Sequence, residues 1–289
     1  MTKSFQFNVL AAAVASLLLS GCGDAETTIN EKEPIIELPQ TPETPDEGDD
    51  GYTIDSMGRL AVLSADSTET FIFDLDESEL LDTFALTYSA SFLTASPDYR
   101  YAVINSRSND NVSFIDGGIW REDHTEHLHD YKQGPAMSDY TLSGSRPTHI
   151  VSHDGQVAVF YDGNVDEGTS AAVQVLSDND ITNETAELPS IQYDINMHGV
   201  AEPRGEHLLS TLRRSDEEST SNAKILPDQV GVYHFHDGEY ELEQTLALNC
   251  PDLHGASQNH EFVVFGCTDG VLVAHQHDDE YEAEKIANI

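Results

Sequence analysis

Basic residues are scarce in this chain. Its 289 residues include 13 Lys and Arg against 53 Asp and Glu, which gives a formal net charge of −40. Nucleic acids and anionic membrane surfaces attract positively charged proteins, so neither is expected as a partner. Cations are the natural small partners of such a surface. The acidic residues are spread along the whole chain, and a solubility adaptation explains the bulk charge equally well. Metal binding is therefore inferred only from specific clusters of ligand-type residues.

The apolar run at the N-terminus is too short to cross a bilayer as a stable helix. It covers residues 9–19, follows the positive charge of Lys3, and is typical of a signal peptide. The run ends in Leu19-Ser20-Gly21-Cys22, which resembles the bacterial lipobox, where the cysteine is lipidated after cleavage. Gly23 after the cysteine favours the outer over the inner membrane. We therefore predict a lipoprotein signal peptide over residues 1–22 and an exported, periplasmic protein that contacts the membrane through its lipid anchor only.

Cysteine is rare as well. If Cys22 carries the lipid, only Cys250 and Cys267 remain, an even pair in an oxidising compartment. We expect a disulfide between them, which would stabilise the fold by about 3 kcal/mol through restriction of the unfolded chain. Two reduced cysteines that bind a metal are the alternative.

Residues 23–51 contain no aromatic side chain. The segment has four prolines and a heavy acidic load, so it cannot bury enough apolar surface to become ordered. We interpret it as a disordered tether between the lipid anchor and a folded domain over residues 52–289.

No helical period is apparent in that domain. Short β-type runs alternate with Asp, Gly, Asn and Ser, and several segments resemble one another. Residues 96–103 align with 152–159, residues 198–203 with 254–259, and residues 231–240 with 270–281. The offsets run from about 41 to about 56 residues, the range of the four-stranded blades of a β-propeller. The sequence therefore predicts an all-β propeller.

About five repeats are recognisable, and the last one stops at Ile289 soon after a strand pair. A propeller protects its sheet edges by closing its ring. Either this ring closes with few blades, or the chain is shorter than its relatives.

The densest metal-ligand pattern lies in residues 121–130, Arg-Glu-Asp-His-Thr-Glu-His-Leu-His-Asp. His124, His127 and His129 stand there among four carboxylates, including Asp123. Imidazole nitrogen with carboxylate oxygen suits Zn²⁺ and its neighbours. Neither one helix nor one strand presents all three rings on one face, so we expect a loop that wraps around the ion. A solvated polar loop is the simpler alternative.

Three further histidines recur at one position of the repeat. His149, His198 and His254 each lie just before or at the start of a repeat's first strand. The innermost strands of propeller blades line a central channel, so equivalent positions converge there. These residues could form a three-histidine zinc site with one open or carboxylate-filled position.

Two histidine pairs occupy strand-like segments. His234 and His236, and likewise His275 and His277, are two residues apart, so each pair shares one face of a strand. Both pairs lie next to hairpin signals. We interpret them as solvated histidines on outer strands rather than as metal ligands.

Several of these segments occur together in one order, which resembles the AztD-type periplasmic zinc metallochaperones. The segments are residues 123–129, 146–149, 158–163, 198–201, 250–255 and 266–273, and the similarity covers roughly residues 52–273. The resemblance implies a β-propeller that passes zinc to the solute-binding protein of an ABC importer. It implies a flexible, His-rich loop that captures zinc, a central histidine site, and a disulfide that would match Cys250–Cys267. Members of the family are mostly soluble and continue beyond the end of this sequence, which leaves the completeness of the ring and of the site open.

The leading hypothesis is a non-enzymatic zinc chaperone. Because residues 121–130 lie outside the aligned repeats, we assign capture to that segment and tight binding to His149, His198 and His254. A metal-dependent hydrolase of the lactonase type is one alternative, since an open metal position can activate water. No general-base or nucleophile motif supports it. A surface-anchored interaction propeller with incidental histidines is the other.

Overall fold

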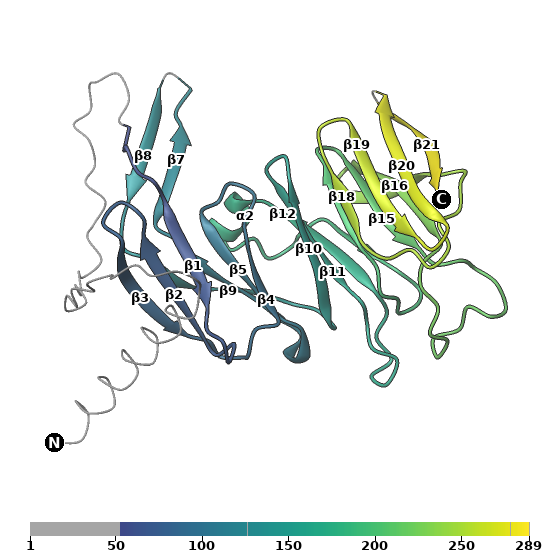
Figure 1. Cartoon of the computed structure of the whole chain (residues 1–289), viewed down its shortest axis with the longest axis horizontal. Helices are drawn as coiled ribbons and strands as arrows, with labels where there is room; N and C mark the ends of the chain where they lie inside the picture. The colour runs from purple at the N-terminus through teal and green to yellow at the C-terminus, as the bar shows by residue number, and fades with distance from the viewer. Residues whose placement is uncertain (1–52, 126, 278, 289) are drawn as a thin grey trace, which may run out of the picture. The chain divides into compact units, whose positions relative to one another are not determined.

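The computed structural model describes residues 53–125, 127–277 and 279–288, whose regular secondary structure is almost entirely β-strand (Figure 1). The first sheet contains β1 (Arg59–Leu63), β2 (Glu69–Asp74) and β3 (Glu79–Ala85). The second contains β4 (Phe92–Ala95), β5 (Tyr101–Ser106), β6 (Asn111–Asp116) and β9 (Ala136–Ser143). The third contains β10 (Pro147–His153), β11 (Gln156–Tyr161), β12 (Ala172–Leu176) and β13 (Ser190–Gln192). The fourth contains β14 (Ala201–Arg204), β15 (His207–Leu212), β16 (Gln229–His236) and β17 (Glu239–Thr245). The fifth contains β18 (Ala256–Gln258), β19 (Phe262–Cys267), β20 (Gly270–His277) and β21 (Glu280–Ala287).

All strand pairs are antiparallel, and each strand pairs with its neighbour in the chain except where a hairpin is inserted between β6 and β9. That hairpin consists of β7 (Ile119–Asp123) and β8 (Leu128–Lys132). Successive four-stranded antiparallel sheets are the blades of a β-propeller. The predicted fold class is therefore confirmed. Among the described residues, the five larger sheets match the five repeats, and the β7–β8 hairpin is a sixth, two-stranded sheet.

In the second and third sheets the second strand is buried on both faces, which explains the apolar runs of β5 and β11. Tyr101 and Val103 of β5 face a cluster shared with the third sheet, whereas Ala102 and Ile104 face one shared with the first. In β11, Val157 and Val159 pack towards the second sheet and Ala158 and Phe160 towards the fourth. Side chains alternate between faces along a strand, so one short run serves two blade interfaces.

Two short helical segments also occur, η1 (Arg107–Asn109) and α2 (Asp178–Thr182). The sequence analysis did not anticipate α2, because five residues are too few to show a helical period. A capping box stabilises it: the Ser177 side chain accepts from the Asp180 amide, and the Asp180 carboxylate accepts from the Ser177 amide.

The predicted signal peptide, Cys22 and the tether lie outside the described residues, so these remain predictions. Among the residues that the structure describes, no helix is long and apolar enough to span a membrane.

Candidate metal centre

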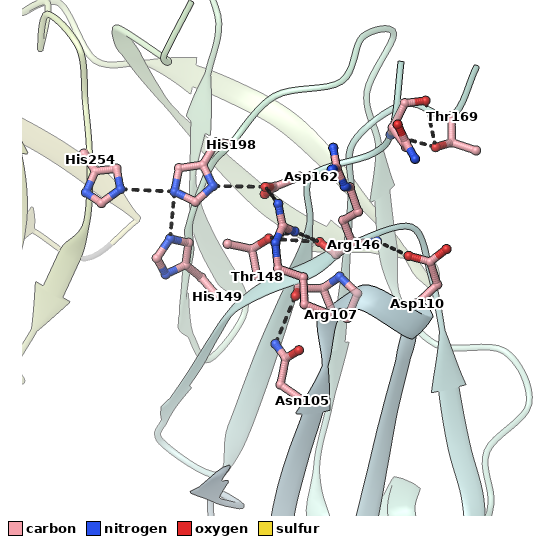
Figure 2. Close-up of polar contacts among 12 residues, drawn as sticks. Asn105, Arg107, Asp110, Arg146, Thr148, His149, Asp162, Thr169, His198 and His254 are labelled. Atoms are coloured by element: carbon pink, nitrogen blue, oxygen red, sulfur yellow. Dashed lines mark hydrogen bonds and ion pairs between the residues drawn. The ribbon is translucent and has the colours of Figure 1, made fainter. Parts of the chain in front are cut away.

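The structure brings His149, His198 and His254 together, each from the beginning of a different sheet (Figure 2). His149 lies in β10, and the other two lie in the segments just before β14 and β18. The Nε2 atom of His198 is 3.4 Å from that of His149 and 3.1 Å from that of His254. Two nitrogens bound to one tetrahedral zinc are about 3.3 Å apart. Two of the three nitrogen pairs therefore already have the spacing of a zinc coordination sphere, and the ligand atoms of all three residues lie within 4.8 Å of one another.

His149 is positioned by polar contacts from the preceding blade. The Asn105 side-chain amide donates to the Pro147 carbonyl at 3.0 Å, and Arg107 donates to the Thr148 hydroxyl at 2.6 Å (Figure 2). Pro147 and His149 pair with consecutive residues of β11, so Thr148 is the extra residue of a β-bulge. Bulges re-aim side chains, and this one sets the direction of His149.

His198 is oriented by a carboxylate. Its Nδ1 lies 3.0 Å from the Oδ2 atom of Asp162, and that same oxygen accepts from Arg107 at 2.9 Å (Figure 2). A carboxylate only accepts, so Nδ1 carries the proton and the Nε2 lone pair faces the other two histidines. Carboxylate–histidine pairs of this kind orient metal ligands and raise their basicity. Asp162 is buried, and its Oδ1 atom has no hydrogen bond.

The backbone around His198 is tightly packed. Met197 is buried, and its amide donates to the Asp162 carbonyl at 2.9 Å. A Cβ atom at Gly199 would overlap the Phe160 ring and the Thr211 hydroxyl. The His-Gly pair at this position thus has a steric origin, since only glycine lets the chain approach Phe160 so closely.

His254 lies in a segment fixed by a disulfide. Cys250 and Cys267 are bonded, with their Cα atoms 4.9 Å apart, as expected from the sequence. The His254 amide donates to the Gly266 carbonyl at 3.0 Å, and Leu253 beside it is buried. The disulfide and this hydrogen bond hold the segment that carries His254 against β19.

His149 favours the neutral imidazole. Burial, together with a smaller effect of the neighbouring His198, lowers the pKa of His149 to about 4. His149 is therefore unprotonated at neutral pH, the form in which imidazole binds a metal.

The sequence and the fold both resemble those of known proteins. No family model matches the sequence. The zinc chaperone AztD of Citrobacter koseri is 23% identical over 220 residues, which cover 75% of this chain and 48% of that protein. A crystal structure of C. koseri AztD matches with a TM-score of 0.65 at 22% identity, over 80% of this chain and 58% of that one. The structure of apo AztD from the same organism gives a TM-score of 0.64 at 21% identity.

This chain is similar to the zinc chaperone AztD. The resemblance inferred from the sequence is thereby confirmed, and the AztD fold is shared. The chain spans about half the length of AztD, so the activity and partners of the whole protein are matters for proposal.

The His-rich segment, residues 121–130, is not the loop wrapped around an ion that the sequence led us to expect. It forms the tip of the β7–β8 hairpin, whose strand pairing extends to Asp123 and Leu128. The ring centroids of His127 and His129 are 4.4 Å apart, and that of His124 is 5.7 Å and 4.9 Å from them. The expectation considered single elements only, whereas a hairpin combines residues of a turn and of a strand.

Two other groups of ligand-type residues occur in the described part of the AztD-like chain. One comprises His153, Asp154 and His260, and the other His234, His236 and Glu243. The prediction that the paired histidines lie on outer strands was wrong. His234 and His236 belong to β16 and His275 and His277 to β20, the third strand of each sheet.

Sequence reasoning assigned no role to Asp162 or Arg107. Asp162 could have been recognised from the sequence. It directly follows an apolar strand and precedes Gly163, a position that suits a binding site better than the hydrophobic core. Arg107 had no such signal, since only the packing of two blades brings it to Asp162.

Proposed function

We propose that this protein binds zinc as cargo and transfers it to another protein. One observation carries the proposal: three Nε2 atoms from three blades converge at distances of 3.4 Å and 3.1 Å, with a buried carboxylate behind one of them. This ligand set fits Zn²⁺, and the similarity to a zinc chaperone supports the same cargo.

The coordination chemistry is suited to transfer. Three imidazoles supply three of the four positions that zinc prefers, and the fourth stays open to water or to a ligand from an incoming protein. A recipient's side chain can enter that position before any of the three histidines leaves. Ligand exchange then moves the ion without releasing it into solution.

The hairpin tip supplies the capture step of the proposal. Its three rings lie within 6 Å of one another, yet they are not among the described groups whose ligand atoms all lie within 4.8 Å. Such an arrangement binds an ion more loosely than the central histidines do. The strongly negative chain, with its formal charge of −40, raises the local concentration of cations.

The recipient in this proposal is the solute-binding protein of a zinc ABC importer, and the site of action is the periplasm. Both follow from the AztD resemblance and from the lipobox at Cys22. A lipid anchor would keep the chaperone and its zinc in the periplasm, the compartment in which a solute-binding protein collects its ion.

Equilibrium dialysis of the mature protein tests the proposal. We expect tight binding of zinc, which is lost when His149, His198 and His254 are replaced by alanine. The matched control replaces His124, His127 and His129, also three histidines, and should slow transfer to a chelator while leaving tight binding intact. If the control variant alone lost the tight site, the two roles would be reversed. If the wild-type protein held no zinc against a competing chelator, the proposal would fail.

A further inference from the structure

The fourth sheet carries a second cluster with metal-binding geometry. His236 Nε2 lies 3.1 Å from one carboxylate oxygen of Glu243, and His234 Nδ1 lies 3.6 Å from the other. The two histidine rings face the same side of β16, with centroids 4.2 Å apart. The ligand atoms of all three residues lie within 4.8 Å of one another. Two imidazoles and one carboxylate form a common ligand set for zinc.

A backbone irregularity places Glu243 in this position. Val232 pairs with Gln244 and Tyr233 with Leu242, so Glu243 is the unpaired extra residue of a β-bulge. Beyond the bulge, Glu241 lies opposite His234 and Glu239 lies opposite His236. The bulge adds a third carboxylate that reaches both rings. Bulges of this kind occur next to functional sites, where they re-aim a side chain.

The fifth sheet provides an internal comparison without the bulge. His275 and His277 occupy the corresponding positions of β20, with ring centroids 4.1 Å apart. Pairing between β20 and β21 is regular, and Glu282 lies opposite His275. Its carboxylate approaches only His277, at 3.8 Å. Among the residues that the structure describes, the same histidine spacing therefore lacks a carboxylate shared by both rings.

A neighbouring histidine supports the cluster from the side. His207 opens β15 directly opposite His234, and the two rings stack with centroids 4.7 Å apart. His207 is 4% exposed, and its Nε2 atom has no hydrogen bond. The stacking restricts the ring of His234, which lowers the entropy lost when that ring binds an ion.

This cluster is separate from the central histidines. Strands β14 and β16 are both antiparallel to β15 and so run in the same direction. His198 precedes the start of β14, whereas His236 stands at the end of β16. The two groups thus lie at opposite ends of the fourth sheet and cannot share one ion.

We propose that His234, His236 and Glu243 form a second, exchangeable zinc site on the fourth sheet. The side chains of His236 and Glu243 are about half exposed, so the ion is open to solvent and exchanges faster than one held by the central histidines. This site does not depend on the proposed chaperone function, because it shares no ligand with the central histidines.

The test uses the full chain with alanine at the three central and the three hairpin histidines. Dialysis of this variant against zinc should leave one ion bound per chain. Adding H234A and H236A should remove it, with a loss of affinity of at least about tenfold. Adding H275A and H277A instead removes two histidines from the corresponding positions of β20 and should leave the amount of bound zinc unchanged. E243Q keeps the side-chain shape and should weaken binding by about tenfold.

Histidine ¹⁵N spectra identify the ligands directly, since the signals of His234 and His236 should shift on zinc addition in every variant that retains them. Circular dichroism checks that each variant is folded. If the six-alanine chain binds no zinc, or if H275A/H277A removes as much zinc as H234A/H236A, the second site does not exist. The wild-type protein and the six-alanine chain should differ in bound zinc. If they do not, the proposed function fails while the second site stands.

Discussion

Replacement of Asp162 tests whether the orientation of His198 contributes to zinc binding, because it leaves His198 itself in place. The carboxylate contacts no other histidine of the centre, yet it fixes the tautomer of His198 through the 3.0 Å contact to Nδ1. In D162A, His198 can place its proton on either nitrogen, and Nε2 is no longer committed to the metal. Loss of a carboxylate behind a metal-bound histidine costs about 10- to 100-fold in affinity, equivalent to about 1.4–2.7 kcal/mol.

D162N should lie at the lower end of that range, because the asparagine carbonyl still accepts from Nδ1 but carries no charge. Competition titration of the purified protein with a chromophoric zinc chelator measures both affinities. The expected order of zinc affinity is wild type, then D162N, then D162A.

A second ion pair provides the control. Asp116 pairs with Arg100 at 2.7 Å, and its carboxylate is largely buried, as is that of Asp162 in the pair with Arg107. No histidine takes part in it, so D116N should reduce stability without altering zinc affinity. An unchanged affinity in folded D162A would refute the reasoning, and so would an equal loss in D116N.

Three other predictions concern stability. The folded-state pKa of His149, about 4, lies below the unfolded value of about 6.5. In the absence of metal, the unfolded chain therefore binds a proton at His149 more readily than the folded chain does. The contribution of His149 to stability should decline as the pH falls from about 6.5 to about 4. Urea unfolding of the wild type and of H149A across this range measures that contribution, and a difference in unfolding free energy that does not change with pH would contradict the prediction. Replacement of Cys250 and Cys267 by serine should lower the free energy of unfolding by about 3 kcal/mol. It should also weaken zinc binding, because the disulfide holds the segment that carries His254. Equal zinc affinity in the wild type and the serine variant would contradict this role of the disulfide. G199A should cost about 1–3 kcal/mol by overpacking against Phe160, whereas G134A, where a Cβ meets nothing within 4 Å, should be nearly neutral in thermal unfolding.

Much of the architecture followed from the sequence because it is repetitive. Segments that recur at blade spacing indicated a propeller, and the recurring position of His149, His198 and His254 indicated that they converge. That inference required only that equivalent positions of neighbouring blades meet near one axis. The cysteine pair was equally accessible, because the two cysteines that remain after Cys22 is assigned to the predicted lipid anchor leave one pairing.

The β7–β8 hairpin, by contrast, depended on which two strands pair. Its histidines suggested a wrapping loop, since no single helix or strand presents all three rings. The pairing of Glu122 with His129 creates the hairpin, and nothing in residues 121–130 alone specifies it.

The bulges at Thr148 and Glu243 and the partner of His198 were decided only by the tertiary structure. A one-residue shift in strand pairing redirects a side chain, and such a shift depends on how blades pack rather than on local residue preference. Asp162 reaches His198 across 36 positions of sequence, and Arg107 reaches Asp162 across 55. The sequence alone indicated that His149, His198 and His254 could bind zinc, whereas the packing of the blades decided how their nitrogens point and which carboxylates support them.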